Sequence, residues 1–474
     1  MGYHPGAEDD GIYLSAIKAD LNPSLFPHDA DFFRLQMRTS FFDNWMASFV
    51  HGTGMPVVWA ELLWQWISIV LIVWACWTLV CQLFEDVPAR WGGLAMFAAM
   101  FTLPVAGTAL YIVDQYLHPR NPATALILFA VSRVLARKAW QALPLVVLAF
   151  LLHPLMGALG ISFCSVLVIV EPLQLRFQVF QRAFLTGEVT TAVVMIPFGW
   201  ILDPPSKTWL DALHSRYWFR LYQWEWYEWL GVIGPMAIFW LIARMARRRG
   251  EQNLARLSLA VLVYSSFQLG VAMIILGPPS LIGMSALEPM RYLHLVYVFL
   301  ALVSGAYLGR YLLRRNVWRW AIFLLLANGG MFLTQRDLFA GSPHLELPGF
   351  RSSNPWLQAF DWVKDNTPQD AYFTLDPNYM GAPGEDYHSF RALAERSQLS
   401  DAIKDTSVVT KVPELGPVWH EQQLATDGWS HFQLHDFERL KSQFGVDWAI
   451  VAFPAPVGLK CAWHNGSVSV CRIP

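Results

Sequence analysis

Charge is the property that this sequence has least of: Asp, Glu, Lys and Arg make up 15% of its 474 residues, and the formal net charge is -2. This balance excludes the strong basic excess expected of a nucleic-acid-binding protein or a polybasic lipid sensor. Residues 1–55 lack an apolar run, which excludes a cleavable signal peptide within them. Hydrophobic residues, in contrast, amount to 55%. The composition is that of a membrane protein.

Long apolar segments recur between residues 56 and 334. The stretch 66–80, WISIVLIVWACWTLV, contains no charged residue, and a helix needs about 20 apolar residues to cross roughly 30 Å of hydrocarbon. Many of the 23 tryptophans lie near the ends of these segments, as expected at a membrane interface. We therefore predict a mainly α fold, a polytopic transmembrane bundle of about ten helices. The predicted helices cover residues 56–82, 92–113, 122–137, 139–152, 154–171, 184–202, 229–245, 256–277, 289–310 and 317–334.

Basic residues alternate between the connections, which predicts the orientation of the bundle. Arg and Lys concentrate near residue 90 and in the ranges 133–138, 176–182, 244–256 and 310–319. Because basic residues in short loops stay in the cytoplasm, the other loops and both chain ends are expected outside it. Export of a polar N-terminal tail normally follows a hydrophobic helix, so we expect one to precede Met1. The alternative is an odd number of crossings, with a cytoplasmic N-terminus.

The composition changes after residue 334, and residues 335–474 are predicted to form an extracytoplasmic α/β domain. Helical spacing of apolar residues in 355–366 and 436–446 predicts two helices, and the runs 371–375 and 448–453 predict strands. The near-continuous apolar run 448–453 is typical of a buried parallel strand. Asn465-Gly466 predicts a final hairpin. Cys461 and Cys471 flank it, either as a disulfide or as two free thiols, because a two-residue turn would put them on opposite faces.

An acidic cluster occupies the first predicted outer loop, residues 1–55. Glu8, Asp9 and Asp10 are consecutive, and such carboxylates can bind a divalent cation such as Mg²⁺ or Mn²⁺, or act as a general base. The alternative is an acidic N-cap for a helix that begins near Ile12. The following segment, 31–50, has a broad apolar face and is predicted to lie along the bilayer surface as an interfacial helix, or to tighten the fold.

Two further groups of polar residues fall in predicted outer loops. VDQYLHPRNPA contains a second acid, Asp114, and a candidate phosphate ligand, Arg120, although these two residues can also pair with each other. Arg291 and His294 lie three residues apart and are predicted to share one helix face, where a lipid phosphate or the nearby Glu288 would pair with the cation. The tryptophan-rich loop 211–229 is interpreted as an interfacial belt, with sugar stacking as a second role.

The arrangement resembles the GT-C superfamily of integral-membrane glycosyltransferases, in particular its uncharacterised bacterial members. The resemblance lies in GAEDDGIYLSAI before a surface helix, Asp114 in the next outer loop, a helical bundle and an outer C-terminal domain containing WVKDNTPQDAYF and FRALAERSQLSD. It covers nearly the whole chain, although each motif is short. The chain departs from the family in showing no transmembrane helix before the first acidic loop.

The resemblance implies an inner-membrane enzyme that moves a sugar, with inversion, from a polyprenyl-phosphate donor to a glycan, lipid or protein of the bacterial cell envelope. Asp9 or Asp10 would serve as base toward the acceptor hydroxyl or as metal ligand, and Asp114 would be the second acid. Arg291 would stabilise the leaving phosphate, with Arg120 and His294 nearby. The alternatives are a transporter or flippase for a lipid-linked substrate, and a non-catalytic envelope-assembly protein. Transporters often contain internal repeats, and none is evident here.

Overall fold

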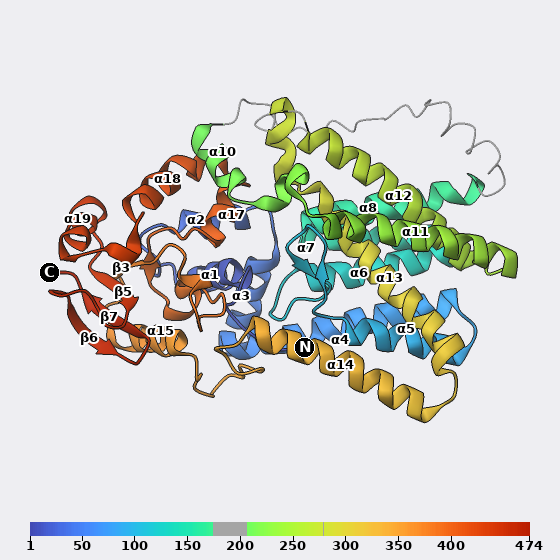
Figure 1. Ribbon diagram of the computed structural model, residues 1–474, viewed down its shortest axis with the longest axis horizontal. Helices are drawn as coiled ribbons and strands as arrows, with labels where there is room; N and C mark the ends of the chain where they lie inside the picture. Colours follow the sequence, from blue (N-terminus) through green and yellow to red (C-terminus); the bar gives the residue numbers. More distant parts are fainter. Residues whose placement is uncertain (174–205, 278) are drawn as a thin grey trace.

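The computed structural model describes residues 1–173, 206–277 and 279–474. Figure 1 shows an elongated molecule in which a bundle of long helices at one end joins a C-terminal lobe of short helices and strands at the other. Three N-terminal helices, α1 (Asp10–Leu21), α2 (Asp31–Met37) and α3 (Phe42–Thr53), lie between these two parts. The mainly helical character that the sequence predicts is confirmed.

Five helical segments of the described residues are long and apolar enough to cross a membrane: α4 (Val57–Leu83), α11 (Trp226–Arg249), α12 (Gln252–Leu276), the run Leu281–Leu313 and α14 (Val317–Leu338). This supports association with a lipid bilayer. The number falls short of about ten, because α5 (Val87–Ala99), α6 (Arg120–Leu135), α7 (Ala142–Leu152) and α8 (Pro154–Leu173) are shorter or less apolar. The helix predicted over 184–202 lies outside the described residues.

The second predicted helix, over 92–113, is wrong in its second half. Helix α5 ends at Ala99, and β1 (Pro104–Val105) pairs antiparallel with β2 (Leu110–Tyr111) in a small hairpin. Pro104 has no N–H to continue a helix, and Gly107 has a positive φ of 59° in the connecting turn. The apolar run therefore turns back on itself and brings Asp114 to the end of the bundle nearest the C-terminal lobe.

Close helix packing fixes the centre of the bundle. Helix α5 packs on α13 (Leu293–Leu308), where Gly92 faces Gly305 and Gly309. A Cβ atom placed on Gly92 would lie 2.3 Å from the carbonyl oxygen of Gly305. Small residues permit this approach of two backbones, a common device in membrane helix pairs.

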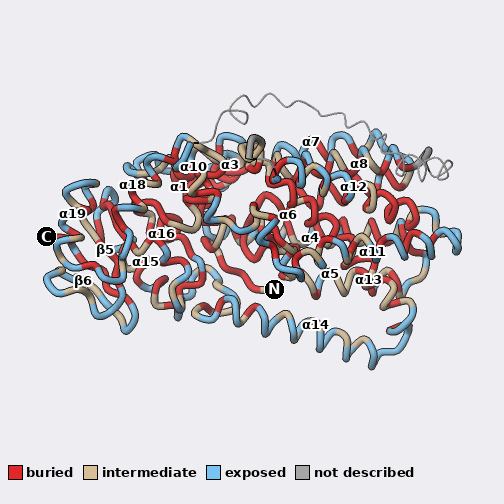
Figure 2. Tube along the Cα trace, turned by 45° about the horizontal axis from the view of Figure 1, so that its top comes forward, coloured by how far each residue is buried: buried red, intermediate tan, exposed pale blue. Residues whose placement is uncertain are grey.

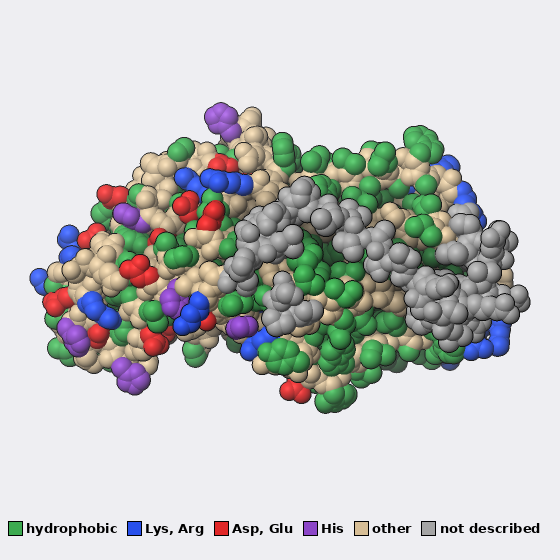
Figure 3. Space-filling view, turned by 90° about the horizontal axis from the view of Figure 1, so that it is seen from above, with side chains coloured by type: hydrophobic (Ala, Val, Ile, Leu, Met, Phe, Trp, Pro, Cys, Tyr) green, Lys and Arg blue, Asp and Glu red, His purple; other side chains and the backbone are tan. Residues whose placement is uncertain are grey.

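Helix α14 differs from the rest of the bundle in its exposure. Only Gln335 among its residues is buried, and Figure 2 shows the helix as an exposed rod beside the buried interior. Its apolar side chains therefore face outward, as expected for a helix in contact with lipid. In Figure 3, hydrophobic side chains cover much of the bundle, whereas charged side chains gather on the C-terminal lobe and at the remote end of the bundle.

The C-terminal lobe contains the predicted α/β elements. Its mixed sheet has the order β4-β3-β5-β7-β6, in which β3 (Tyr372–Leu375) is parallel to both β4 (Ser397–Gln398) and β5 (Trp448–Ala452). The expected parallel strand over 448–453 is thus confirmed. Helices α15 (Pro355–Asn366) and α19 (Leu434–Phe444) match the helical spacing. The remaining lobe helices are α16 (Phe390–Ala394), α17 (Lys404–Val409) and α18 (Gly416–Ala425).

The terminal hairpin pairs β6 (Lys460–His464) with β7 (Val468–Arg472), and Cys461 and Cys471 form a disulfide across it. His464 is the last residue paired before the turn, opposite Ser469, so the loop is longer than a two-residue Asn-Gly turn. A register shift between Cys461 and Trp463 then aligns the two cysteines. The disulfide alternative is therefore the one that the structure contains.

The segment predicted as one interfacial helix forms two, α2 and α3, separated near Thr39. Phe32, Phe33 and Phe42, which were expected to face the bilayer, are each 1% exposed and belong to the core of the bundle. Helix α1 covers them, since it packs against both α2 and α3. These side chains of the apolar face therefore tighten the fold and do not lie along the bilayer surface.

Candidate functional site

The first nine residues cross the junction between the bundle and the C-terminal lobe, with a turn in which the N–H of Ala7 donates to the carbonyl of His4. Tyr3 forms a bridge with Leu345, and Ala7 forms one with His388. The backbone N–H of His4 donates to the carbonyl of Gln115, 2.9 Å away. The N-terminal segment is therefore held by the loop before α6, by the segment after α14 and by the lobe. This path delivers Asp9 to a cavity at the junction.

The cavity has a volume of about 520 Å³ and is lined by Tyr387 and by five segments that are distant in sequence. They are the N-terminal segment, the β1–β2 hairpin with the following loop, the tryptophan-rich loop, the start of the Leu281–Leu313 run, and α17 with the turn after it. The charged residues in its lining are Glu8, Asp9, Asp114, Arg216, Glu228, Glu288, Arg291, Lys404 and Lys411. Four predicted site residues, Glu8, Asp9, Asp114 and Arg291, therefore share one cavity.

The carboxylate of Asp9 is held ionised by its neighbours. The Lys404 ammonium lies 3.0 Å from Asp9 Oδ1 and also pairs with Glu8. Burial alone would raise the pKa of Asp9, but Lys404, with smaller effects of Arg120 and Lys411, holds that pKa well below its usual value. The Asp9 side chain remains 29% exposed, so an ionised carboxylate is available to a molecule in the cavity.

The tautomer of His118 follows from its hydrogen bonds. The backbone N–H of Arg120 donates to His118 Nδ1 over 3.0 Å, so this nitrogen carries no proton. The proton of the neutral ring is then on Nε2, which lies 3.8 Å from Asp9 Oδ2. Burial, with Arg120 adding to it, lowers the pKa of His118 well below its usual value and keeps the ring neutral. His118 therefore presents an N–H toward Asp9.

Asp114 and Arg120 pair with each other, which the sequence analysis gives as the alternative to phosphate binding by Arg120. Arg120 Nη2 donates to Asp114 Oδ1 over 2.6 Å and Nε donates to Oδ2 over 3.0 Å, a bidentate arrangement in which both residues are at most 2% exposed. Arg120 is absent from the cavity lining, so the prediction that it holds a donor phosphate is not supported by this geometry. The pair instead fixes the loop that carries His118.

Asp10 points away from the cavity although it follows Asp9 directly. Asp9 is the N-cap of α1 but its side chain forms no capping hydrogen bond. Asp10 is 1% exposed, and its Oδ2 accepts from the backbone N–H of Gly6 over 2.6 Å. Burial and the neighbouring carboxyl of Glu61 raise the pKa of Asp10 well above its usual value. The acids therefore stand at the N-terminus of a helix, as the capping interpretation expects, although Asp9 makes no capping hydrogen bond, and Asp10 is absent from the cavity lining.

The three consecutive acids do not form a common cation site. Asp10 is turned to Gly6, while Glu8 and Asp9 both pair with Lys404, whose ammonium supplies the positive charge between them. The expectation that Glu8, Asp9 and Asp10 together hold Mg²⁺ or Mn²⁺ therefore does not fit. The reason is the backbone, which directs adjacent side chains of the first helical turn to different sides.

Arg291 and His294 also separate. Arg291 lines the cavity, and its Nε lies 2.8 Å from Glu288 Oε2, the partner that the sequence suggests as an alternative to phosphate. His294 is 1% exposed and its Nε2 lies 3.0 Å from the carbonyl oxygen of Ile112. His294 is absent from the lining, so Arg291 and His294 share neither a helix face nor the cavity. The expectation that both bind a donor phosphate does not fit this geometry.

Three cations of the cavity were not foreseen: Arg216, Lys404 and Lys411. Lys411 forms no hydrogen bond or ion pair through its ammonium within the described ranges of the chain. Burial lowers the pKa of Lys411, and Glu288 only partly opposes this effect. Lys404 lies just after FRALAERSQLSD, but nothing in the local sequence signals its partner, because 395 positions separate it from Asp9.

Comparisons with known proteins give no assignment: no protein-family model matches the chain, and no curated protein sequence is significantly similar to it.

Proposed function

We propose that this protein is a GT-C-type membrane glycosyltransferase that moves a sugar from a polyprenyl-phosphate donor to a hydroxyl group of a cell-envelope glycan, lipid or protein. The observation that carries the proposal is the cavity at the end of an apolar helix bundle, whose lining contains the ionised carboxylate of Asp9 together with two cations, Arg291 and Lys411. A carboxylate and cations in the lining of one cavity are the groups that sugar transfer from a phosphate carrier requires.

The donor phosphate is assigned to Lys411 and Arg291. Lys411 is partly buried, and its ammonium forms no ion pair with another described residue, which favours binding of an anion. Arg291 uses Nε for Glu288, and its terminal nitrogens form no ion pair with the described residues, which leaves them for a phosphate oxygen. When the bond between the anomeric carbon and the phosphate oxygen breaks, the electron pair stays on the phosphate, whose growing negative charge these cations stabilise.

Asp9 is assigned to the acceptor. Its carboxylate accepts the proton of the acceptor hydroxyl as the hydroxyl oxygen attacks the anomeric carbon from the side opposite the phosphate, so that the configuration is inverted. His118 and Lys404 orient the carboxylate from two directions. Asp114 and Arg120 act through His118 and are positioning residues in this scheme, since their charged atoms are paired with each other.

The lipid nature of the donor fits the surroundings of the cavity. Its lining includes Trp218 and Phe219 of the aromatic loop and ends of apolar segments of the bundle, surfaces suited to a polyprenyl chain or a sugar face. We place this end of the bundle on the outer side of the bacterial inner membrane, because basic residues gather at the remote end. On this orientation, the N-terminal segment and the C-terminal lobe are extracytoplasmic.

The experiment uses the full chain, purified and reconstituted into nanodiscs, with an isotopically labelled polyprenyl-phosphate sugar and a bacterial envelope extract as acceptor source. We expect labelled sugar to move to an acceptor with inverted anomeric configuration, and polyprenyl phosphate to accumulate. Asp9→Asn is the inactive control, and Asp31→Asn, at an exposed acid of α2, is the matched active control.

Three results would reject the proposal. The first is an equal rate for Asp9→Asn and wild type. The second is use of a nucleotide sugar in preference to the lipid donor. The third is movement of intact lipid donor across liposomes without cleavage, which would identify a transporter or flippase instead.

A further inference from the structure

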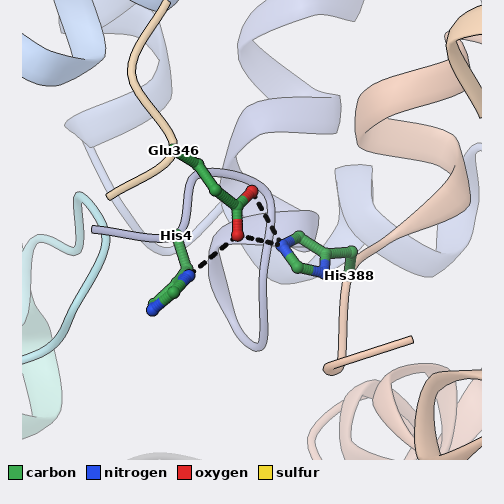
Figure 4. Close-up of side chains that lie close together, drawn as sticks. All are labelled: His4, Glu346 and His388. Carbon is green, nitrogen blue, oxygen red and sulfur yellow. Dashed lines mark hydrogen bonds and ion pairs between the residues drawn. The ribbon is translucent and has the colours of Figure 1, made fainter. Parts of the chain in front are cut away.

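Outside the cavity, two histidines and a glutamate from three distant segments meet. Glu346 Oε1 lies 2.8 Å from His4 Nδ1, and Glu346 Oε2 lies 3.1 Å from His388 Nε2. Figure 4 shows both rings turned toward the carboxylate from opposite sides. Both histidines are fully buried, and the candidate ligand atoms all lie within 4.8 Å of one another.

The hydrogen bonds of His388 leave a lone pair directed at this carboxylate. His388 Nδ1 lies 2.9 Å from the carbonyl oxygen of Glu385, and a carbonyl can only accept, so Nδ1 carries a proton. In a neutral ring, Nε2 is then unprotonated and faces the oxygens of Glu346, which are acceptors as well. A cation between them satisfies both groups. Histidines that bind metals commonly donate their other N–H to a backbone carbonyl in this way.

The surroundings contain more acid than base. Glu385 is fully buried and accepts the backbone N–H of His388, while Asp386 is 8% exposed and has one oxygen, Oδ2, without a partner. Within the described part of the chain, no lysine or arginine forms an ion pair with Glu346, Glu385 or Asp386. Buried carboxylates that lack basic partners favour a bound cation.

We propose that His4, Glu346 and His388 bind one divalent transition-metal ion of the Zn²⁺ class. Two imidazole nitrogens and one carboxylate oxygen are ligands that Zn²⁺ accepts, leaving a fourth position for water. With metal–ligand distances of about 2.0–2.2 Å, neighbouring ligands in a tetrahedral site lie about 3.3 Å apart. The single oxygen Oε1 of Glu346 lies 2.8 Å from His4 Nδ1 and 3.2 Å from His388 Nε2, both within about 0.5 Å of this value. Each ring has to move by less than about 1 Å to bring the nitrogens together.

The position of the site gives it a structural role. His4 belongs to the N-terminal segment, Glu346 follows α14 and His388 belongs to the C-terminal lobe. One ion would therefore connect all three parts close to the bridges formed by Tyr3 and Ala7. This holds the segment that ends at Asp9, and it separates the metal from the cavity, whose lining includes none of the three ligands.

The competing interpretation is an ion pair without metal. Although burial would lower the pKa of His388, Glu346 raises it to about 9, so an imidazolium and a carboxylate can hold the cluster. The two interpretations differ in whether the cluster takes up Zn²⁺ at neutral pH and in the atoms that surround the ion.

The test uses the full chain in nanodiscs, treated with a chelator, desalted and titrated with Zn²⁺ alone at pH 7.5. We expect one equivalent of Zn²⁺ to bind and to remain after desalting. His4→Gln, Glu346→Gln and His388→Gln should each weaken binding at least tenfold, whereas His435→Gln, at a side chain that is 76% exposed, should bind as wild type. Absence of retained Zn²⁺ in wild type, or equal retention by the three variants, would overturn the proposal.

A second measurement does not depend on the folding of the variants. X-ray absorption of the Zn²⁺-loaded wild-type chain should show two imidazole ligands and only nitrogen or oxygen in the first shell. Sulfur ligands, or fewer than two imidazoles, would place the ion elsewhere and contradict the assignment. No sugar donor takes part in either measurement, so the outcome is independent of the proposed transferase activity.

Discussion

Asp9 and Asp10 are neighbours in the chain, yet they lie in opposite environments. Asp9 faces a cavity with Lys404 and His118 beside it, and its pKa is lowered. Asp10 is buried against the carboxyl of Glu61, and burial together with that carboxyl raises its pKa. One residue is therefore an available carboxylate, whereas the other is held as a neutral acid. Which acids of a motif belong to a site therefore depends on the direction in which the backbone places each side chain.

The largest contrast is expected between the amide variants of the two acids. Asp9→Asn should lower the initial rate of sugar transfer at least a hundredfold, because the base that accepts the hydroxyl proton is lost. Asp10→Asn should change it less than threefold, since the amide replaces a neutral acid of the same shape. Radiolabel transfer in nanodiscs measures both rates. Equal losses of transfer rate in the two variants would contradict the assignment of different roles to Asp9 and Asp10.

The cations Arg291 and Lys411 should have the next largest effect. Arg291→Ala and Lys411→Ala should each lower donor turnover about tenfold or more, because the leaving phosphate loses a stabilising charge. Arg291→Lys should recover part of the rate. Arg351→Ala, at an exposed arginine of the segment between α14 and α15, is the control. If turnover stays normal in both cavity variants, the phosphate lies elsewhere.

Lys404 should control the pH dependence of the transfer rate, because it lowers the pKa of Asp9. Removal of this ammonium in Lys404→Met ends the main effect that lowers the Asp9 pKa, so the carboxylate becomes protonated at higher pH. The acid limb of the transfer rate should therefore shift upward in pH relative to wild type. Rate profiles between about pH 4 and 8, a range around the usual carboxyl and imidazole pKa values, measure the shift. An acid limb that does not move would assign the limb to another group.

The smallest effect is expected in the pH dependence of protein stability that Asp10 causes. Its folded-state pKa is raised, so the proton of Asp10 stabilises the fold fully below the unfolded-state pKa, and this contribution is lost as pH rises through the folded-state value. Asparagine stays neutral throughout. Asp10→Asn should therefore unfold at a temperature a few degrees higher than wild type at alkaline pH, with a smaller difference at acidic pH. A gain of order 1 kcal/mol corresponds to about one unit of pKa. A constant or reversed difference would contradict the assigned protonation.

Local sequence patterns predicted the elements of the C-terminal lobe well. Trp356, Phe360 and Val363 lie on the buried face of α15, and Asn354 caps this helix by accepting the N–H of Trp356. The apolar run at 448–453 forms the expected parallel strand. Both patterns involve residues only a few positions apart, so they can be recognised in one sequence without knowledge of long-range contacts.

The candidate site was predicted only in part, because its geometry depends on long-range contacts. The sequence brought Asp9, Asp114 and Arg291 to one end of the bundle, and the three line one cavity. It did not reveal Lys404 as the partner of Asp9, nor the opposite direction of Asp10, since both follow from the path of the N-terminal segment between the bundle and the lobe.

The most direct measurement is an electron cryo-microscopy structure of the Asp9→Asn chain in nanodiscs with a bound polyprenyl-phosphate sugar. We expect the phosphate between Arg291 and Lys411, with the anomeric carbon of the sugar facing residue 9. A donor bound outside this cavity, or with its phosphate against residue 9 and away from both cations, would contradict the assignment of the site.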